Sequence, residues 1–269
     1  MALAAALEAD VCEIYTDVDG VFTADPRIVP TARKLDRVTY EEMLEMAACG
    51  AKILHLRCVE YARRYDIPIH VRSSFSKLEG TVVEGSINEQ AHQEAPMEAA
   101  IIAGVAHDRS EAKITVVGVP DKVGVAARVF EALAAAQINL DMIVQNVSAA
   151  ATNLTDISFT LPRSDGQNAM TALARLQDEV GYERLLYDDQ IGKVSLIGAG
   201  MRSHPGVTAK FFSALAEAGV NIEMISTSEI RISVIVDEAD VDSAVAATHT
   251  AFDLDSDEVQ AVVYGGTGR

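Results

Sequence analysis

KITVVGVPDKVGVAARVFEALAAAQINLDMI (residues 113–143) returns later in the chain as KVSLIGAGMRSHPGVTAKFFSALAEAGVNIEMI (193–225), and this internal repeat decides the fold. The offset is 80 residues between Lys113 and Lys193 and 82 residues between Asn139 and Asn221. The second copy therefore carries two extra residues in the loop between its strand and its helix. A unit that recurs in this way indicates two modules with the same fold.

Each copy continues with the same succession of patterns. A second and a third strand follow the repeated stretch, and then come a helix and a short last strand. The order β-α-β-β-α-β predicts a ferredoxin-like module with four strands and two helices on one face of the sheet. The segments are TDISFTL (155–161), DGQNAMTALARLQDEV (165–180) and LLYD (185–188) in the first copy, and EIRISVIV (229–236), ADVDSAVAATHTAF (239–252) and AVVYG (261–265) in the second.

The residues before the repeat have a different pattern. Val11–Phe22 is rich in strand formers and is broken by an Asp-Gly turn at 19–20, and Thr39-x-x-Glu42 is a capping box ahead of an apolar helix. We expect a helix at 1–8, another at 59–67, and strands at 67–75 and 80–83. The strand pattern IIAGVAH (101–107) has no counterpart between the two copies. We expect it to pair with a strand distant in sequence, near the C-terminus, so that the modules interleave.

These patterns divide the chain into four segments. The polar stretch at 84–99 contains Gly, Pro and Asn and is typical of a linker. We therefore predict an N-terminal portion at 1–83, a linker at 84–99, one module at 100–188 and a second module at 189–269.

Composition excludes several classes of function. The chain has 40 Asp and Glu against 22 Lys and Arg, a net charge of −18, which disfavours nucleic acid and anionic membranes as partners. No apolar run reaches the roughly 20 residues of a membrane span. The three cysteines are sparse and predict reduced thiols, and the six histidines show no metal-ligand spacing. We expect a cytoplasmic protein without its own metal site, in which DLDSDEVQ (253–260) forms an exposed turn.

Both copies contain groups that could hold a free amino acid. A strand ends in a Gly-containing loop that opens a helix, and the free N–H groups of a helix start can bind a carboxylate. Asn139 with Asp141, and Asn221 with Glu223, stand before the next strand, where an acid could hold an ammonium group. The alternative is that these are ordinary turns with helix caps, and spacing alone leaves both interpretations open.

The repeat resembles a pair of ACT modules, the amino-acid-sensing fold of many biosynthetic enzymes. QNVS (145–148), KVSLIGAGMRSHPGVTA (193–209) and ISTSEIRISV (225–234) resemble the regulatory end of aspartate kinase. The resemblance implies lysine, threonine or both as effectors, bound at interfaces between ACT modules of associated chains in a homo- or hetero-oligomer. It implies as contacts Asp121, Gly124, Val125, Ala126, Asn139, Leu140, Asp141 and Gln145 in the first module, and Ser203, His204, Pro205, Gly206, Val207, Thr208, Asn221, Ile222 and Glu223 in the second.

The N-terminal portion resembles the late part of the aspartate kinase catalytic domain. The resemblance rests on YTDVDGVFTADPR (15–27), EMLEMAACGAKILHLRCVEYA (42–62) and IPIHVRSSF (67–75). It implies an α/β (α+β) chain, a partial amino-acid-kinase fold followed by two ferredoxin-like ACT domains. The implied ATP contacts are Thr16, Asp17, Phe22, Thr23, Ala24, Asp25, Pro26, Arg27 and Lys52. Asp19 is expected to form the turn, and the D-x-D-G string lacks the later ligands of a calcium loop.

Two segments of the family are not found in this sequence: a Lys-Phe/Tyr-Gly-Gly phosphate loop and a Gly-Ser-Asp-Thr-Thr segment that helps to bind substrates. We therefore expect no catalytic residue in this chain, and little kinase activity from the chain alone. The complete enzyme would use ATP with Mg²⁺ to convert L-aspartate to 4-phospho-L-aspartate, the first step toward lysine, threonine and methionine. The chain would be a truncated kinase or a regulatory subunit that pairs with a catalytic chain. A third interpretation is an oligomerisation scaffold without a ligand.

Overall fold

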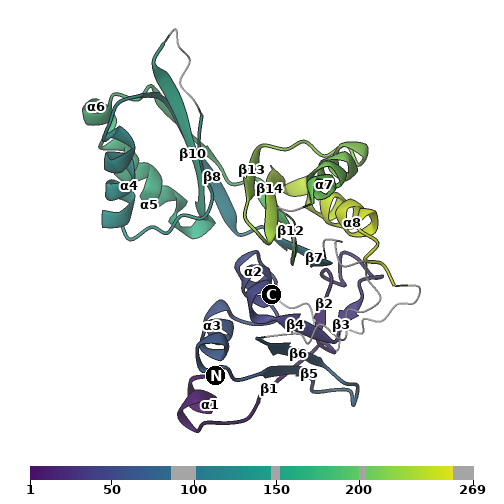
Figure 1. Ribbon diagram of the computed structural model, residues 1–269. Coiled ribbons are helices and arrows are strands. Elements are labelled where there is room, and N and C mark those ends of the chain that lie inside the picture. Colours follow the sequence, from purple (N-terminus) through teal and green to yellow (C-terminus); the bar gives the residue numbers. More distant parts are fainter. Residues whose placement is uncertain (86–100, 147–151, 200, 202–203, 257–269) are drawn as a thin grey trace. The chain divides into compact units, whose positions relative to one another are not determined.

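The computed structural model describes residues 1–85, 101–146, 152–199, 201 and 204–256. The chain forms two compact units (Figure 1). One unit contains residues 1–108, 193–236 and 240–269, and the other contains 109–192 with 237–239. Most of the linker predicted at 84–99, and the last strand predicted at 261–265, lie outside the described residues.

The N-terminal portion is a small sheet with helices packed beside it. Its four strands follow the order β1-β5-β6-β4, and β1 and β5 run parallel. The capping box is confirmed, because the Thr39 side chain accepts the N–H of Glu42 while the Glu42 side chain accepts the N–H of Thr39. The elements are α1 (Ala2–Ala6), β1 (Cys12–Thr16), β2 (Val21–Phe22), β3 (Lys34–Leu35), β4 (Arg37–Thr39), α2 (Tyr40–Ala48), α3 (Leu56–Tyr65), β5 (Ile69–Ser73) and β6 (Thr81–Glu84).

The first module has the ferredoxin-like arrangement that the repeat predicts. Its sheet has the order β11-β8-β10-β9, and α4 and α5 lie on one face of it (Figure 1). Phe159 of the sheet and Leu133 of α4 are fully buried in the core between the two layers. The elements are β8 (Glu111–Pro120), α4 (Val125–Ala135), β9 (Ile143–Gln145), β10 (Leu154–Pro162), a 3-10 turn (Arg163–Asp165), α5 (Gly166–Ala174), α6 (Gln177–Val180) and β11 (Arg184–Asp188).

The second module repeats this arrangement with one strand from elsewhere. Its sheet has the order β13-β14-β12-β7, so β7 holds the edge that β11 holds in the first module. The expectation that 101–107 pairs with a distant strand is confirmed, but its partner is β12 at the start of this module and not a strand near the C-terminus. The elements are β7 (Ile101–Asp108), β12 (Ile191–Ala199), α7 (Pro205–Glu217), β13 (Met224–Thr227), β14 (Arg231–Asp237), a 3-10 turn (Glu238–Asp240) and α8 (Val241–Ala251).

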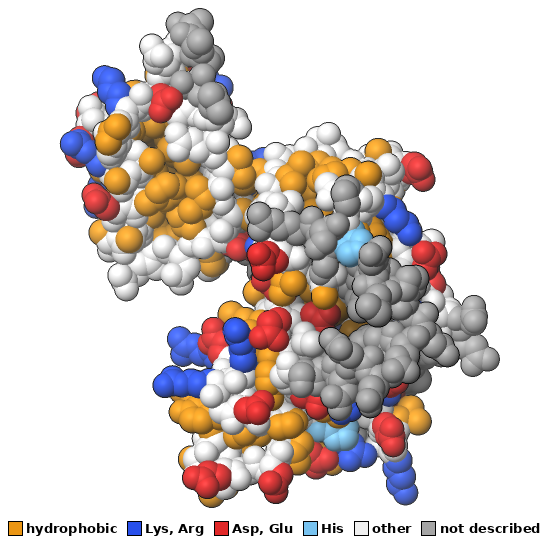
Figure 2. Space-filling view, viewed as in Figure 1, with side chains coloured by type: hydrophobic (Ala, Val, Ile, Leu, Met, Phe, Trp, Pro, Cys, Tyr) orange, Lys and Arg blue, Asp and Glu red, His pale blue; other side chains and the backbone are white. Residues whose placement is uncertain are grey.

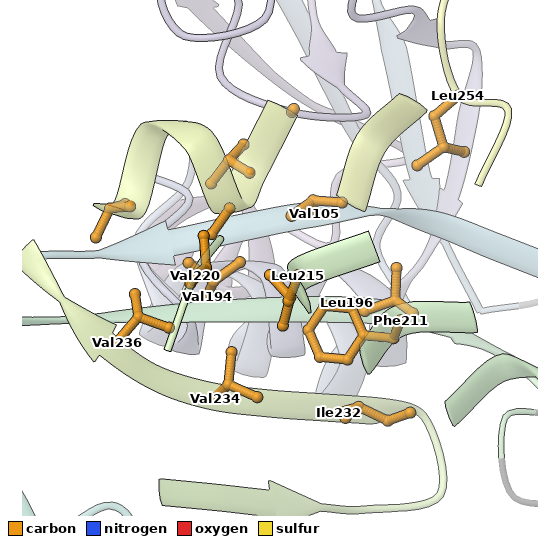
Figure 3. Close-up of a cluster of buried hydrophobic side chains, with 14 of the residues drawn as sticks. Val105, Val194, Leu196, Phe211, Leu215, Val220, Ile232, Val234, Val236 and Leu254 are labelled. Carbon is orange, nitrogen blue, oxygen red and sulfur yellow. The ribbon is translucent and has the colours of Figure 1, made fainter. Parts of the chain in front are cut away.

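The second module and the N-terminal portion share hydrophobic cores within their unit. Phe211 and Leu215 of α7 pack with the sheet residues Val194 and Val234, as Figure 3 shows. Ala24, Val29 and Ala32, which lie between β2 and β3, belong to the same cluster. Leu254 also points into it, so the expectation of an exposed turn is wrong for the described residues that follow Asp253. No helix in the described residues is long and apolar enough to cross a membrane.

Candidate functional site

The nucleotide-side loop is defined here as residues 21–33, which run from β2 toward β3. Thr16 and Asp17 stand at the end of β1, where Thr16 Oγ1 donates to Asp17 Oδ1 at 3.2 Å. The loop closes on itself, because the N–H of Thr23 donates to Arg33 O at 2.9 Å. The structure thus places Thr16 and Asp17 at the carboxyl end of a sheet strand, and the candidates at 22–27 in a loop with defined main-chain hydrogen bonds.

A tight ion pair shapes the exposed end of this loop. Arg27 Nη2 lies 2.6 Å from Asp25 Oδ2, and the N–H of Arg27 donates to Asp25 Oδ1 at 3.0 Å. Burial raises the pKa of the Asp25 carboxyl, but the hydrogen bonds and the charge of Arg27 outweigh burial and hold that pKa below its usual value. Asp25 therefore stays ionised and orients the Arg27 guanidinium, which remains exposed.

The remaining nucleotide candidates have different surroundings. Thr23 and Ala24 are buried, so their side chains face the protein, whereas Phe22 and Pro26 are partly buried. Lys52 is exposed in the turn between α2 and α3, and not in the nucleotide-side loop.

Asp19, expected to form a turn, is also a buried acid. Only 2% of its surface is exposed, and Asp19 Oδ1 accepts a hydrogen bond from Ser76 Oγ. Among the described residues, Asp19 Oδ2 has no hydrogen-bond partner.

In the first module, the candidate effector residues form two groups at opposite ends of the sheet. Asp121, Gly124, Val125 and Ala126 follow the end of β8 and open α4, and Gly124 has a φ of 91°, which favours glycine. The second group precedes β9 and contains Asn139, Leu140 and Asp141, whereas Gln145 at the end of β9 lies between the two groups, because it pairs with Ile157, which pairs with Val116 of β8.

The pairing of the strands gives the separation of these groups. The N–H of Asp141 donates to Thr160 O at 3.1 Å, and Thr160 pairs with Lys113 near the start of β8. Asp121 instead follows Pro120 at the end of that strand. About seven residues of strand, roughly 23 Å, lie between the two levels. One module therefore does not bring the candidate carboxylate-binding group and the candidate ammonium-binding group together.

The second module places its candidates at the equivalent points of the chain. His204, Gly206, Val207 and Thr208 lie at the start of α7, and Val207 is buried. Asn221, Ile222 and Glu223 precede β13, where the N–H of Glu223 donates to Ile235 O at 2.8 Å. Ser203 lies outside the described residues, and Pro205 is the first residue of α7.

The structure adds polar residues that the sequence did not single out. His249 of α8 is buried and lies 2.8 Å from Thr23 Oγ1 of the nucleotide-side loop. Arg231 of β14 pairs with Glu45 of α2 at 3.1 Å. Nothing in the sequence singled out Arg231, and His249 stood there as one of six scattered histidines, a residue type that is usually just hydrogen-bonded.

Comparisons with known proteins agree with this architecture. The family described as "Amino acid kinase family" matches residues 1–73, and the family described as "ACT domain" matches 114–176 and 194–252. The aspartokinase of Mycolicibacterium smegmatis is 65% identical over 269 residues, which is 100% of this chain and 62% of that protein. The chain thus spans about three fifths of the length of the curated relatives that it matches.

Two solved proteins are informative. The regulatory subunit of aspartate kinase from Thermus flavus is 43% identical, with a TM-score of 0.54, over 56% of this chain and 99% of that chain. E. coli aspartokinase III in complex with aspartate and ADP is 28% identical, with a TM-score of 0.78, over 93% of this chain and 54% of that chain. The same protein in complex with lysine and aspartate gives a TM-score of 0.69 at 28% identity, over 92% and 53%. With these matches along its whole length, the chain belongs to the aspartokinase family.

Proposed function

We propose that this chain is the nucleotide-side and regulatory portion of a cytoplasmic aspartate kinase, which transfers a phosphoryl group from ATP to L-aspartate. The observation that carries the proposal is the order of an amino-acid-kinase segment and two ACT domains on one chain. We assign phosphoryl transfer, with 4-phospho-L-aspartate and ADP as products, to the complete protein. This would be the first step toward lysine, threonine and methionine.

Two of the candidate nucleotide residues are positively charged, as the binding of a phosphate group requires. Arg27 and Lys52 are exposed cations, and Asp25 holds the Arg27 guanidinium in one orientation. Because Thr23 and Ala24 are buried, and the Thr23 N–H and C=O are both hydrogen-bonded within the protein, these two residues would support the loop while their more exposed neighbours contact a nucleotide. Among the described residues no group of three His, Cys, Asp or Glu could hold a metal ion, so we expect Mg²⁺ to enter with the phosphates of ATP.

The effector sites would be composite. Since each module separates its two groups of candidates, a complete site for an amino acid needs a second module, which an associated chain can supply. The edge strands support this, because β9 and β13 each end their sheets and carry the corresponding exposed residues Ile143 and Ile225. Figure 2 shows further hydrophobic side chains on the viewed face of the first module. Lysine and threonine are the proposed effectors.

Calorimetric titration of the chain with lysine and with threonine tests the sensing function. We expect saturable binding of at least one, weakened about tenfold or more by Asp141→Ala or Glu223→Ala, because the ammonium would lose its charged partner. Glu131→Ala, which removes an exposed acid in the middle of α4, is the charge-matched control and should bind normally. If neither amino acid binds at millimolar concentration, the sensing function is wrong.

A second candidate function is a regulatory subunit that pairs with a separate catalytic chain. The observation that favours it is the match over 99% of the regulatory subunit from Thermus flavus. An ADP-release assay with ATP, Mg²⁺ and aspartate separates the two candidates. Turnover by the chain alone would favour the kinase, whereas turnover that appears only with an added catalytic chain would favour the subunit. A chain that forms oligomers but binds no amino acid would instead be a scaffold.

A further inference from the structure

The nucleotide-side loop is held on one side by the edge strand of the second module. The N–H of Val105 in β7 donates to Thr23 O at 2.7 Å. Gly104 allows this approach, because a Cβ added there would lie 2.5 Å from the same oxygen. The main chain of the loop is therefore hydrogen-bonded directly to β7 in the sheet of the second module.

On the other side, His249 reaches from α8 to the same threonine. It is fully buried, with Nε2 at 2.8 Å from Thr23 Oγ1 and Nδ1 at 3.2 Å from Asp255 Oδ1. The N–H of Arg33 donates to Thr23 Oγ1 at 2.9 Å, so the Thr23 hydroxyl can donate its proton to His249 Nε2. The Asp255 carboxylate accepts the Nδ1 proton. A single neutral tautomer of His249 therefore satisfies every partner.

The residues after α8 complete the contact. Thr31 Oγ1 donates to Asp255 Oδ1, and the N–H of Ser256 donates to Thr31 O at 2.8 Å. Arg33 Nε donates to Leu254 O at 3.0 Å. Leu254 is itself buried in the core of the second module (Figure 3). Thr23 near one end of the nucleotide-side loop, and Thr31 and Arg33 near the other end, are thus hydrogen-bonded to residues 249–256 of the second module.

Helix α8 is also in contact with the helix that begins at the candidate effector residues. Phe211 and Leu215 of α7 share a hydrophobic cluster with Val241 and Val245 of α8. Protein cores are closely packed and do not deform continuously, so a shift of α7 would move α8. His249 therefore lies between α7, which begins at candidate effector residues of the second module, and the nucleotide-side loop.

We propose that His249 is a positioning residue, which fixes Thr23 and thereby the conformation of the nucleotide-side loop from within the sensing module. The inference rests on the proposed nucleotide role of residues 22–27. His249 acts through Thr23 and would not touch the nucleotide. Burial is the main influence that lowers the pKa of His249, in agreement with the neutral form that the hydrogen bonds require.

Amide hydrogen exchange of the complete 269-residue chain tests this role without any ligand. His249→Leu and Thr23→Val should each speed the exchange of the Thr23 and Arg33 amides at least tenfold. The double variant should add little to either, because both changes break the same contact. His249→Gln and Thr23→Ser keep a polar atom near the position of the original hydrogen-bonding atom. In these two variants the exchange rates should stay within about threefold of the wild type, which a role in packing alone would not produce. If His249→Leu fails to fold, Thr23→Val and the two conservative variants still decide.

Ser233→Ala is the matched control. It removes a buried hydrogen bond of 2.7 Å to Ser195, which joins β14 to β12 and does not involve the loop. It should leave the loop amides unchanged relative to those of β12. Unchanged loop exchange in both His249→Leu and Thr23→Val, or equal acceleration in Ser233→Ala, would overturn the positioning role.

Titration with MgADP separates this inference from the proposed function. If the wild-type chain binds MgADP, the affinity should fall about tenfold in His249→Leu and Thr23→Val and stay within twofold in Ser233→Ala. Affinity that is equal in all variants would overturn the link to the nucleotide. If the wild type does not bind MgADP, the nucleotide role of the loop fails, and hydrogen exchange alone supports or refutes the coupling.

Discussion

Replacing Gly104 by alanine should loosen the nucleotide-side loop and leave the first module undisturbed. The added methyl carbon would lie 2.5 Å from Thr23 O and 3.1 Å from Met46 Cε. An ordinary contact begins at about 3.4 Å, so the loop and β7 must separate by about 0.9 Å. That movement would stretch the hydrogen bond from the Val105 N–H to Thr23 O, now 2.7 Å, to about 3.6 Å and break it.

The expected magnitude follows from two effects. A lost hydrogen bond costs about 1 kcal/mol, and overpacking of a filled site costs about 1–3 kcal/mol. Local opening of the loop should thus become easier by about 2–4 kcal/mol. Since each 1.4 kcal/mol is a factor of ten, the Val105 and Thr23 amides should exchange roughly 30 to 700 times faster.

Hydrogen exchange resolved by peptide measures this effect, with β8 and β10 of the first module as the internal reference. Gly206→Ala is the control, because a Cβ there meets no atom of the described residues within 4 Å. We expect it to leave the loop unchanged. Equal exchange in Gly104→Ala and the wild type would refute the close packing of β7 against the loop, and equal acceleration in β8 and β10 would show a global effect.

Three further predictions follow from buried groups. Burial, helped by the charge of Arg33 and opposed by Asp255, holds the pKa of His249 below its ordinary value of 6.5. As the pH drops, the histidine of the unfolded chain is therefore protonated before that of the folded chain. The stability of this unit should thus fall from pH 7 through 6.5 to the pKa of the folded state. His249→Gln should flatten that dependence in urea unfolding at several pH values, and an equally steep dependence would count against it. Phe159→Ala should destabilise the first module by about 3–5 kcal/mol, and Phe211→Ala should do the same to the other unit, each seen by exchange in its own strands only. Thr248 Oγ1 is buried without a partner among the described residues, so Thr248→Val should leave thermal unfolding unchanged or stabilise the protein by up to about 1 kcal/mol; a clear loss would reveal a missed contact.

The parts of the fold with a local signal could be predicted. The repeat revealed two modules because each copy has its own strand and helix periodicity. The Thr39 capping box was visible because its partners are three residues apart. The family resemblance added the kinase fold of the N-terminal portion, which composition alone did not indicate.

Features that depend on distant pairing were less visible. The strand at 101–107 was recognised, but nothing local distinguishes β12 from a C-terminal strand as its partner. The acidic stretch around Leu254 was predicted to be exposed. Leu254 is instead buried in the core of the second module, and the Asp255 carboxylate accepts a hydrogen bond from Thr31 of the nucleotide-side loop. Thr23 and His249 are 226 positions apart, so only the fold shows that they meet.

The candidate effector residues show the same limit. Asp121 and Asp141 are close in sequence, and an amino acid could be imagined between them. Because α4 returns the chain to the start of β8 before β9 begins, the two acids stand at opposite ends of the sheet. Strand direction, and not spacing in the sequence, thus decides which groups can share a ligand.

Sedimentation of the chain with and without lysine and threonine tests the composite effector site most directly. If each site needs two modules from associated chains, effector binding and association are linked. The effector that binds should shift the protein toward dimers or larger species at low micromolar concentration, and Asp141→Ala or Glu223→Ala should weaken the shift. A monomer that becomes saturated with lysine or threonine and stays monomeric would contradict the composite site.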